Sequence, residues 1–314
     1  MAIERVCVVG AGVIGSLYAG HLAREVEVSV LTRREEQASA LAERGLRISG
    51  KSDFTAPVQA TADPAELPDF DLGILATKAT QLEQAAAQLA GRFDGATLMT
   101  IQNGLGAEEV VRSFGGWPLI SAVTFMSGVR HDDAHVEYEL DTETWLGPYA
   151  GTATFEQAQE IEALLVEAGL RAHAFPDLRP AQWSKLIFNA TVNTVSALTN
   201  LPHVGQFAAR DRPTDLGHLV HDLVAEGKAV AAAAGVALHE DPWEMNVLAV
   251  RRGETLAAEG HYAHVPSMLE DIRAGRPTEI DFITGALVRE ADRLGVPVPL
   301  HTAMFRLVKA RETV

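Results

Sequence analysis

The first half of the chain alternates short apolar runs with stretches of helical periodicity. Apolar, β-branched runs predict strands at 6–10, 26–31, 72–77, 97–101 and 118–125. The stretches between them predict helices at 13–24, 35–44 and 80–91. Strands that alternate with helices are typical of a doubly wound parallel sheet with helices on both faces.

The pattern changes in two steps further along. Runs at 134–140 and 144–149 predict antiparallel additions to the sheet, and 171–176 predicts its last strand. Between them, Thr154-x-x-Gln157 is a capping box that opens a helix ending at Gly169. After Asp177 the strand pattern gives way to long helical periodicity.

We predict two helices in that second half, over 219–234 and 278–294, each ended by a glycine. The second would begin at Thr278, in Thr-x-x-Asp after Arg276-Pro277. The sequence therefore predicts an α/β domain over 1–177 and an all-helical domain over 178–314, joined by a short hinge.

The composition is that of a globular protein with two domains, and its charge limits the classes of binding partner. The chain has 314 residues, 47% of them hydrophobic and 22% charged. Acidic residues outnumber basic ones 42 to 26, which gives a net charge of −16. Because that charge repels polyphosphate backbones and anionic lipids, we expect neither nucleic-acid nor membrane binding. A small phosphorylated ligand is still allowed, provided that basic groups gather around it.

The cysteine content and the first residues of the sequence favour a location in the cytoplasm. The single cysteine, Cys7, excludes a disulfide framework and fits a reducing cytosol. No stretch reaches the ~18 apolar residues that span a bilayer, and Met1 leads almost directly into a strand without a leader. We therefore expect a cytoplasmic protein. The oligomeric state stays open, with a homodimer as one option.

A glycine-rich loop follows the first predicted strand and opens the first helix. Its sequence is Gly10-Ala11-Gly12-Val13-Ile14-Gly15, which is G-x-G-x-x-G. In this setting the first glycine permits a tight turn, the second lets a pyrophosphate approach, and the third lets helix and strand pack closely. The loop predicts a Rossmann-type domain that binds a dinucleotide, with phosphates at the helix start.

The end of the second strand indicates which dinucleotide. A site for NAD usually places Asp or Glu there, to bind the adenosine ribose. Here the strand runs into Thr32-Arg33-Arg34, with no carboxylate before Glu35. A guanidinium suits a 2′-phosphate, so NADP(H) is the expected cofactor. The alternative is that these arginines are ordinary solvated side chains.

Two polar clusters follow other strands, at the edge where such sheets bind ligands. Lys78-Ala-Thr-Gln81 follows the strand at 72–77, and Gln102-Asn103-Gly104 follows the strand at 97–101. Either cluster alone could be a surface lysine or an ordinary turn. Their occurrence together at one edge favours a role beside the nicotinamide.

The helical half carries a polar stripe on an otherwise apolar helix. Lys185, Asn189 and Asn193 recur every four residues, so successive members lie about 40° apart on one face, and Ser196 continues the stripe. Solvated faces normally use stronger helix formers than asparagine. The stripe therefore favours a polar pocket over an exposed face.

A lysine in such a pocket could serve as a general acid. It would donate a proton to a carbonyl oxygen as a hydride reaches the carbon, and partial burial would lower its pKa toward working pH. Glu279 is a candidate partner carboxylate, at the expected start of a helix. Favourable charge at a helix N-terminus is its alternative explanation.

These residues together resemble the ketopantoate reductases (2-dehydropantoate 2-reductases) over nearly the whole chain. In the first half the matching residues are GAGVIG at 10–15, Arg33, Lys78-x-x-Gln81 and Gln102-Asn103-Gly104. In the second half they are Trp-x-Lys185-Leu-x-x-Asn189-x-x-x-Asn193, Ser267-Met-Leu-x-Asp271 and Arg276-x-Thr278-Glu279-Ile-Asp281.

The resemblance implies NADPH-dependent reduction of ketopantoate, a 2-oxo acid, to pantoate in pantothenate biosynthesis. It implies that Lys185 is the general acid and Glu279 the partner that orients lysine and substrate. The implied substrate-binding residues are Asn103, Asn189, Asn193 and Ser267. The implied cofactor-binding residues are Gly10, Gly12, Val13, Ile14, Gly15, Arg33, Lys78, Gln81, Asn103 and Glu279.

One position departs from the family pattern. Well-studied members of the family have an asparagine three residues before the serine of Ser-Met-Leu, and here that residue is His264. Histidine is bulkier and titrates near neutral pH. This substitution is compatible with the reduction chemistry. It leaves the substrate open, since some relatives reduce other branched or aromatic 2-oxo acids.

Three rival interpretations follow from the same residues. A non-catalytic NADP(H)-binding redox sensor would need the loop and Arg33 but neither Lys185 nor Glu279. An NAD-dependent hydroxyacid dehydrogenase is disfavoured by Arg33-Arg34. A metal site is not expected, because the pairs His218/His221 and His261/His264 lack a third ligand at diagnostic spacing.

Overall fold

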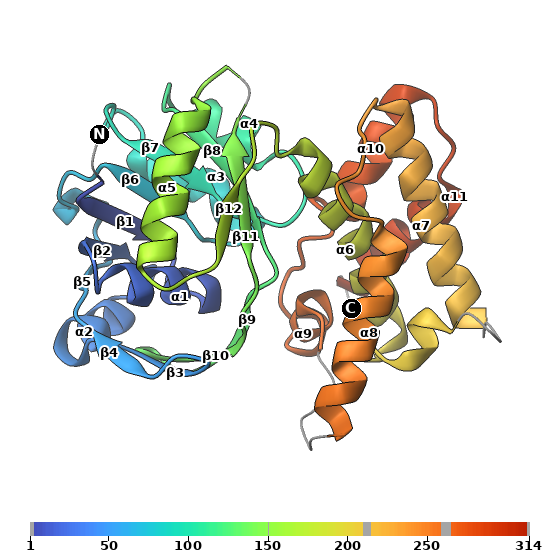
Figure 1. Cartoon of the computed structure of the whole chain (residues 1–314), viewed down its shortest axis with the longest axis horizontal. Coiled ribbons are helices and arrows are strands. Elements are labelled where there is room, and N and C mark those ends of the chain that lie inside the picture. The colour runs from blue at the N-terminus through green and yellow to red at the C-terminus, as the bar shows by residue number, and fades with distance from the viewer. Residues whose placement is uncertain (1–2, 150, 210–214, 259–264, 313–314) are drawn as a thin grey trace. The chain divides into compact units, whose positions relative to one another are not determined.

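A computed structural model of the chain describes residues 3–149, 151–209, 215–258 and 265–312. The chain divides into two compact units (Figure 1). The first comprises Met1–Gln102 and Ala107–Leu178, and the second comprises Arg179–Val314 together with the short segment Asn103–Gly106. The first is α/β and the second is helical, which confirms the predicted fold class.

The first unit is built on an eight-stranded sheet with the order β12-β11-β8-β7-β6-β1-β2-β5. Every neighbouring pair is parallel except β8 and β11, so the predicted antiparallel addition at 144–149 is confirmed. The bounds are β1 Arg5–Val9, β2 Glu27–Leu31, β5 Gln59–Thr61, β6 Leu72–Leu75, β7 Thr97–Thr100, β8 Leu119–Thr124, β11 Thr144–Pro148 and β12 Ala172–Ala174.

Side chains of β1 alternate between two hydrophobic cores, as the two-residue period of a strand requires. Val6 and Val8 join the core formed with α1 (Val13–Leu22) and α5 (Phe155–Glu167). Cys7 and Val9 join the core on the other face, formed with α3 (Leu82–Leu89) and α4 (Ala107–Arg112). Burial on both faces explains why the strand reads as a continuous apolar run. The Thr154–Gln157 capping box at the start of α5 is present as predicted.

A second, four-stranded sheet with the order β4-β3-β10-β9 packs against α1. Its strands are β3 Leu46–Gly50, β4 Phe54–Ala56, β9 Ser127–Asp132 and β10 His135–Leu140. The run at 134–140 was expected in the main sheet. It instead lies in this second sheet, antiparallel to β9 and parallel to β3. Helix α2 (Glu35–Arg44) and the short 3-10 helices η1 (Pro64–Glu66) and η2 (Ala79–Gln81) complete the unit.

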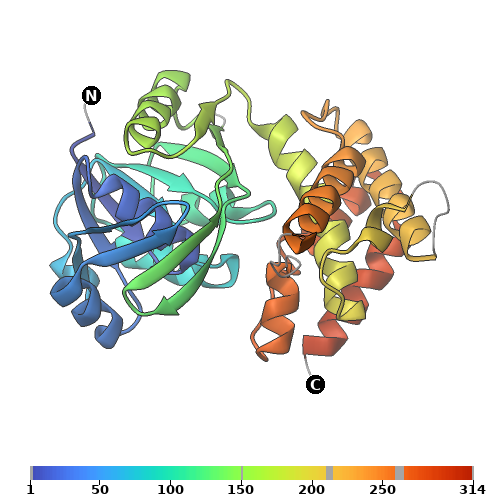
Figure 2. The ribbon, with the colours of Figure 1, turned by 60° about the horizontal axis from the view of Figure 1, so that its bottom comes forward.

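The second unit is organised around α6 (Arg179–Thr199), which contacts each of the other five α-helices of the unit that the structure describes. These are α7 Asp215–Ala233, α8 Pro242–Ala258, α9 Ser267–Arg273, α10 Thr284–Leu294 and α11 Pro299–Glu312, with a 3-10 helix η3 at Gly205–Ala208. The same helices are seen after rotation in Figure 2. Within the described residues, every helix is too short or too polar to cross a lipid bilayer.

Candidate active site

The three glycines of the loop between β1 and α1 meet three different steric demands. Gly10 has a φ of +103°, and a Cβ there would lie 2.9 Å from the backbone nitrogen of Thr77. A Cβ at Gly15 would lie 2.0 Å from the carbonyl oxygen of Gly10, so a side chain would push α1 away from the turn. At Gly12 a Cβ would meet nothing within 4 Å, which leaves open space beside the backbone. These are the demands of a turn, a close helix–strand contact and an approach path for a pyrophosphate.

The N-terminus of α1 is left open to an anion. Its N-cap residue Gly12 has no side chain to bond the first N–H groups, and the first turn, which begins with Val13 and Ile14, contains no acidic residue. The buried side chain of Gln37, on α2, donates a hydrogen bond of 2.9 Å to the carbonyl of Ala11. This hydrogen bond connects the glycine-rich loop to α2 and stabilises the conformation of the loop. The sequence contains no signal for it, since Gln37 lies 26 residues away on an ordinary helix.

The two arginines after β2 are in different environments. Arg34 forms an ion pair with Asp133. Arg33 is exposed and makes neither a hydrogen bond nor an ion pair with any residue that the structure describes. Of the two, Arg33 is therefore the guanidinium available to an incoming phosphate.

Polar residues after β6 and β7 lie at the same edge of the sheet as the loop, because β6 pairs with β1 and with β7. Lys78 is half-buried before η2, and Gln81 is exposed at its end. The buried Nε2 of Gln102 donates to the carbonyls of Leu75 (2.7 Å) and Thr77 (2.9 Å). Gln102 thus holds the ends of β6 and β7 together.

The polar stripe of α6 is buried. The exposed fractions of Lys185, Asn189 and Asn193 are 5%, 7% and 6%, which excludes a solvated face. Leu186 and Ile187 pack in one apolar core of the unit, and Val192 and Val195 pack in another. The stripe occupies the remaining sector of the helix.

Asn103 joins this stripe from the segment that follows β7. A Cβ at Gly104 would lie 1.9 Å from the carbonyl oxygen of Phe282, so glycine permits the segment to run against that backbone. The N–H of Leu105 donates to the same oxygen at 3.1 Å. The Nδ2 of Asn189 then donates to the Oδ1 of Asn103 at 3.3 Å. Two of the predicted substrate-binding amides are therefore in direct contact.

The Lys185 ammonium has a strongly lowered pKa. Burial lowers the pKa of Lys185 from 10.5 to about 7, against the charge of Glu279, which raises it. Glu279 is itself 9% exposed. A lysine with a pKa near neutrality can both hold and release a proton at working pH.

The prediction that a helix begins at Thr278 was wrong. Helix α10 begins at Thr284, and the preceding residues form turns in which the N–H groups of Phe282 and Ile283 donate to the carbonyl of Glu279 (3.0 and 3.1 Å). The hydroxyl of Thr278 does not cap a helix, because it donates to Glu312. Glu279 is therefore not explained by favourable charge at a helix N-terminus.

Ser267 is the first residue of α9, follows the N-cap Pro266 and is exposed. Helix α9 packs on α6. His264, the departure from the family pattern, lies outside the described residues, as does His261. Within the described residues, no group of three or more His, Cys, Asp or Glu side chains could hold a metal ion.

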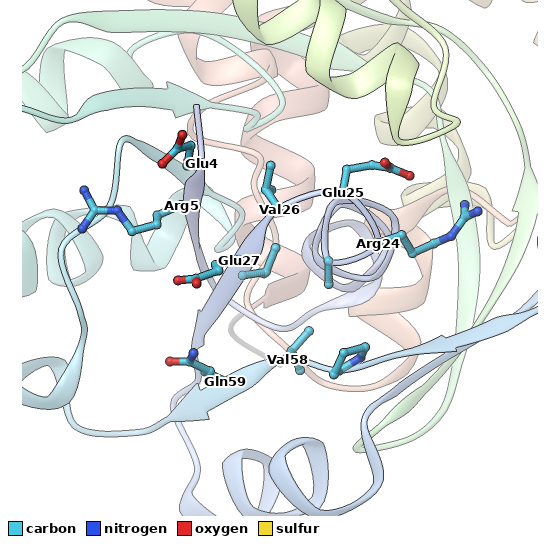
Figure 3. Close-up of a pocket in the computed structure, with 11 residues that line it drawn as sticks. Glu4, Arg5, Arg24, Glu25, Val26, Glu27, Val58 and Gln59 are labelled. Carbon is cyan, nitrogen blue, oxygen red and sulfur yellow. The ribbon is translucent and has the colours of Figure 1, made fainter. Parts of the chain in front are cut away.

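A groove of about 670 Å³ opens at the amino ends of the strands, away from the loop (Figure 3). Acidic and basic side chains mix along it, among them Glu4, Arg5, Arg24 and Glu27. The Arg5 guanidinium bonds Asp71, and the Arg24 guanidinium lies over the ring of Phe54. Ligands of parallel sheets bind at the opposite, carboxyl ends of the strands. This groove therefore lies at the end of the sheet opposite to the glycine-rich loop.

Comparison with known proteins identifies the class of protein as an oxidoreductase. The family model described as ketopantoate reductase PanE/ApbA matches residues 6–151, and its C-terminal counterpart matches 177–312. The 2-dehydropantoate 2-reductase of Pyrococcus horikoshii is 30% identical over 98% of both chains. That of Archaeoglobus fulgidus is 28% identical over 100% of this chain and 99% of its own.

Solved structures show the same relationship. A PanE/ApbA family ketopantoate reductase from Ralstonia eutropha superposes with a TM-score of 0.83 at 29% identity, covering 99% of both chains. A D-mandelate dehydrogenase with NADH and anilino(oxo)acetate also gives 0.83 over 99% of both chains, at 23% identity, which shows a shared fold alone. The chain belongs to the ketopantoate reductase family, and the resemblance seen in the sequence is confirmed.

Proposed function

We propose that this protein uses NADPH to reduce 2-dehydropantoate (ketopantoate) to pantoate, a step of pantothenate biosynthesis. The observation that carries the proposal is the buried Lys185, whose pKa of about 7 suits proton donation to a carbonyl oxygen. The relatives named 2-dehydropantoate 2-reductase support the substrate. A redox sensor that lacks catalysis would have no need of a lysine placed in this way.

Bound NADPH would supply a hydride to the carbonyl carbon of the substrate. The Nζ of Lys185 donates the proton that the carbonyl oxygen takes up, and the lysine is left neutral. The charge of Glu279 stabilises the protonated lysine before transfer, and its carboxylate orients lysine and substrate. Burial excludes water, so the proton passes to the substrate and not to solvent.

Amide and hydroxyl groups would hold the substrate. The linked amides of Asn103 and Asn189 present donors and an acceptor at one place, and Asn193 lies one turn further along α6. The hydroxyl of Ser267 at the start of α9 would donate to the substrate carboxylate. Together these groups would fix the carbonyl relative to Lys185.

For the cofactor we propose the open N-terminus of α1, with its phosphates beside Gly12, Val13 and Ile14. Arg33 would bind the 2′-phosphate, because it is exposed and Arg34 is already paired. Lys78 and Gln81 would lie on the nicotinamide side. A related fold is known with NADH, so the choice of NADPH depends on Arg33 and not on the fold.

A second candidate is a reductase of another branched or aromatic 2-oxo acid. His264 favours it, because a bulkier side chain stands where the family has asparagine. The lysine chemistry would be unchanged, and only the shape of the accepted substrate would differ.

The experiment is NADPH oxidation at 340 nm with ketopantoate beside a panel of branched and aromatic 2-oxo acids. A kcat/KM for ketopantoate of about 10⁴ M⁻¹s⁻¹ or above, the ordinary enzyme range, is expected. Faster turnover of another acid would move the function to that substrate. NADPH binding without reduction of any acid would contradict the proposal and favour a sensor.

A further inference from the structure

Glu312, in the last turn of α11, forms hydrogen bonds with Thr278, the residue that precedes Glu279. One oxygen of Glu312, Oε1, accepts hydrogen bonds from the N–H of Thr278 (2.8 Å) and from its hydroxyl (2.6 Å). The Thr278 hydroxyl in turn accepts the N–H of Ile280 at 3.2 Å. Thr278 is only 2% exposed, so these bonds are shielded from competing water. The backbone on both sides of Glu279 is thereby tied to one carboxylate.

The same turn of α11 also holds the other side of the segment. The Nζ of Lys309 donates to Asp281 Oδ2 at 2.9 Å and lies 3.1 Å from Glu312 Oε2. Arg289 adds a bond of 3.0 Å to the carbonyl of Asp281. Residues 278 and 281, which flank Glu279, are therefore both fixed by side chains from outside the segment.

Such external support is needed because the segment has no regular structure of its own. Glu279 lies in a bend followed by turns at 280–283, and α10 begins only at Thr284, so the Glu279 side chain does not project from a regular helix. Helix α11 packs on α6, the helix that carries Lys185. A contact from α11 therefore ties the backbone beside Glu279 to a helix that packs against the helix of Lys185.

We propose that Glu312 is a positioning residue for the reaction: by holding Thr278 it fixes the Glu279 carboxylate relative to Lys185. This inference rests on the proposed roles of Lys185 and Glu279. It adds that the last turn of the C-terminal helix, which ends at the letter C in Figure 2, controls proton transfer without touching substrate.

The test measures the pKa of Lys185 directly, by NMR titration of the full-length protein with ¹³C-labelled lysine, the signal being assigned with Lys185→Arg. The charge of Glu279 raises the pKa of Lys185. We expect Glu312→Ala to lower the pKa of Lys185 by about 0.5 or more, because a displaced carboxylate stabilises the ammonium less. Glu312→Gln keeps an oxygen that accepts both bonds, so it should retain the wild-type value. Glu290→Ala, which removes an exposed ion pair with Arg293 on α10, is the matched control and should change nothing.

Two comparisons separate positioning from other effects. If Glu312 acts through Glu279, then Glu312→Ala should cause no further change in a Glu279→Gln background. Thr278→Val should reproduce part of the effect and Thr278→Ser should restore it, which keeps the test decisive if Glu312→Ala unfolds. An unchanged lysine pKa in Glu312→Ala, or an equal change in Glu312→Gln, would overturn the inference, since the second result would mean a direct effect of charge.

Kinetics supply the second readout. Glu312→Ala should lower kcat for ketopantoate about tenfold, because a displaced Glu279 carboxylate no longer orients the lysine and the substrate. The titration needs no substrate. A wild-type protein that fails to reduce ketopantoate would therefore refute the proposed function, while the titration still decides whether Glu312 positions Glu279 relative to Lys185.

Discussion

Asn189 donates a hydrogen bond of 3.3 Å to Asn103, although 86 positions separate them in the sequence. The bond joins the segment after β7 to the helix that carries Lys185, and so places two amides at one point. We expect Asn103→Ala and Asn189→Ala each to weaken transition-state binding by about 1–2 kcal/mol. Their effects on kcat/KM should be less than additive, with a coupling of about 0.5–1.5 kcal/mol. Strict additivity would show that the two amides act independently on the substrate.

Arg33 should decide the choice between NADPH and NADH. Because its guanidinium is unpaired within the described structure, Arg33→Gln should raise the KM for NADPH by about 10–100-fold, or about 1.4–2.7 kcal/mol. The KM for NADH should change little. Arg34→Gln is the control, since Arg34 already pairs with Asp133 and should affect both cofactors equally. Equal losses for both cofactors in Arg33→Gln would remove it from the 2′-phosphate site.

The glycine loop offers a pair of substitutions with opposite consequences. Gly15→Ala should lower the free energy of unfolding by about 2–3 kcal/mol, because its Cβ would lie 2.0 Å from the Gly10 oxygen. Gly12→Ala has open space, so the protein should keep its melting temperature while its affinity for NADPH falls at least about tenfold. Thermal melting and cofactor titration of both variants measure the two effects. A Gly12→Ala protein with wild-type affinity would place the pyrophosphate elsewhere.

The pH dependence of the reaction follows from the lysine. The folded protein lowers the pKa of Lys185 from 10.5 to about 7, so its ammonium form, the proposed proton donor, is present below pH 7 and lost above it. We expect kcat/KM for ketopantoate reduction to fall about tenfold per pH unit above neutrality, and oxidation of pantoate to show the opposite trend. Glu279→Gln should move the fall to lower pH, since Glu279 raises the pKa. A profile that is flat up to about pH 9 would contradict an acid role for this lysine.

Much of the first unit was predictable because its strands are buried on both faces. Each continuous apolar run, such as that of β1, is followed by a recognisable turn or helix. The second sheet was predicted only in part. The sequence predicts the strand at 134–140, but β9 is largely exposed and polar and β4 has only three residues. Neither carries a periodic signal strong enough to mark a strand.

In the candidate site, too, local features could be predicted from the sequence and contacts between distant residues could not. The stripe of Lys185, Asn189 and Asn193 was visible because helical spacing is local. The support for Glu279 was not, because the sequence pattern predicts a helix start at Thr278, whereas the Thr278 hydroxyl bonds Glu312, 34 positions away. Gln37 likewise braces the loop through a contact between distant residues. Such contacts leave no periodic trace in a sequence.

The central claim is that Lys185 donates the proton, and replacing it tests that claim most directly. Lys185→Ala should lower kcat for NADPH-dependent reduction by about 10²–10⁴-fold while the Kd for NADPH stays within about twofold of wild type. The measurement is single-turnover NADPH oxidation with saturating ketopantoate, with cofactor affinity determined on the same preparation. Wild-type turnover in Lys185→Ala would show that another group protonates the carbonyl oxygen.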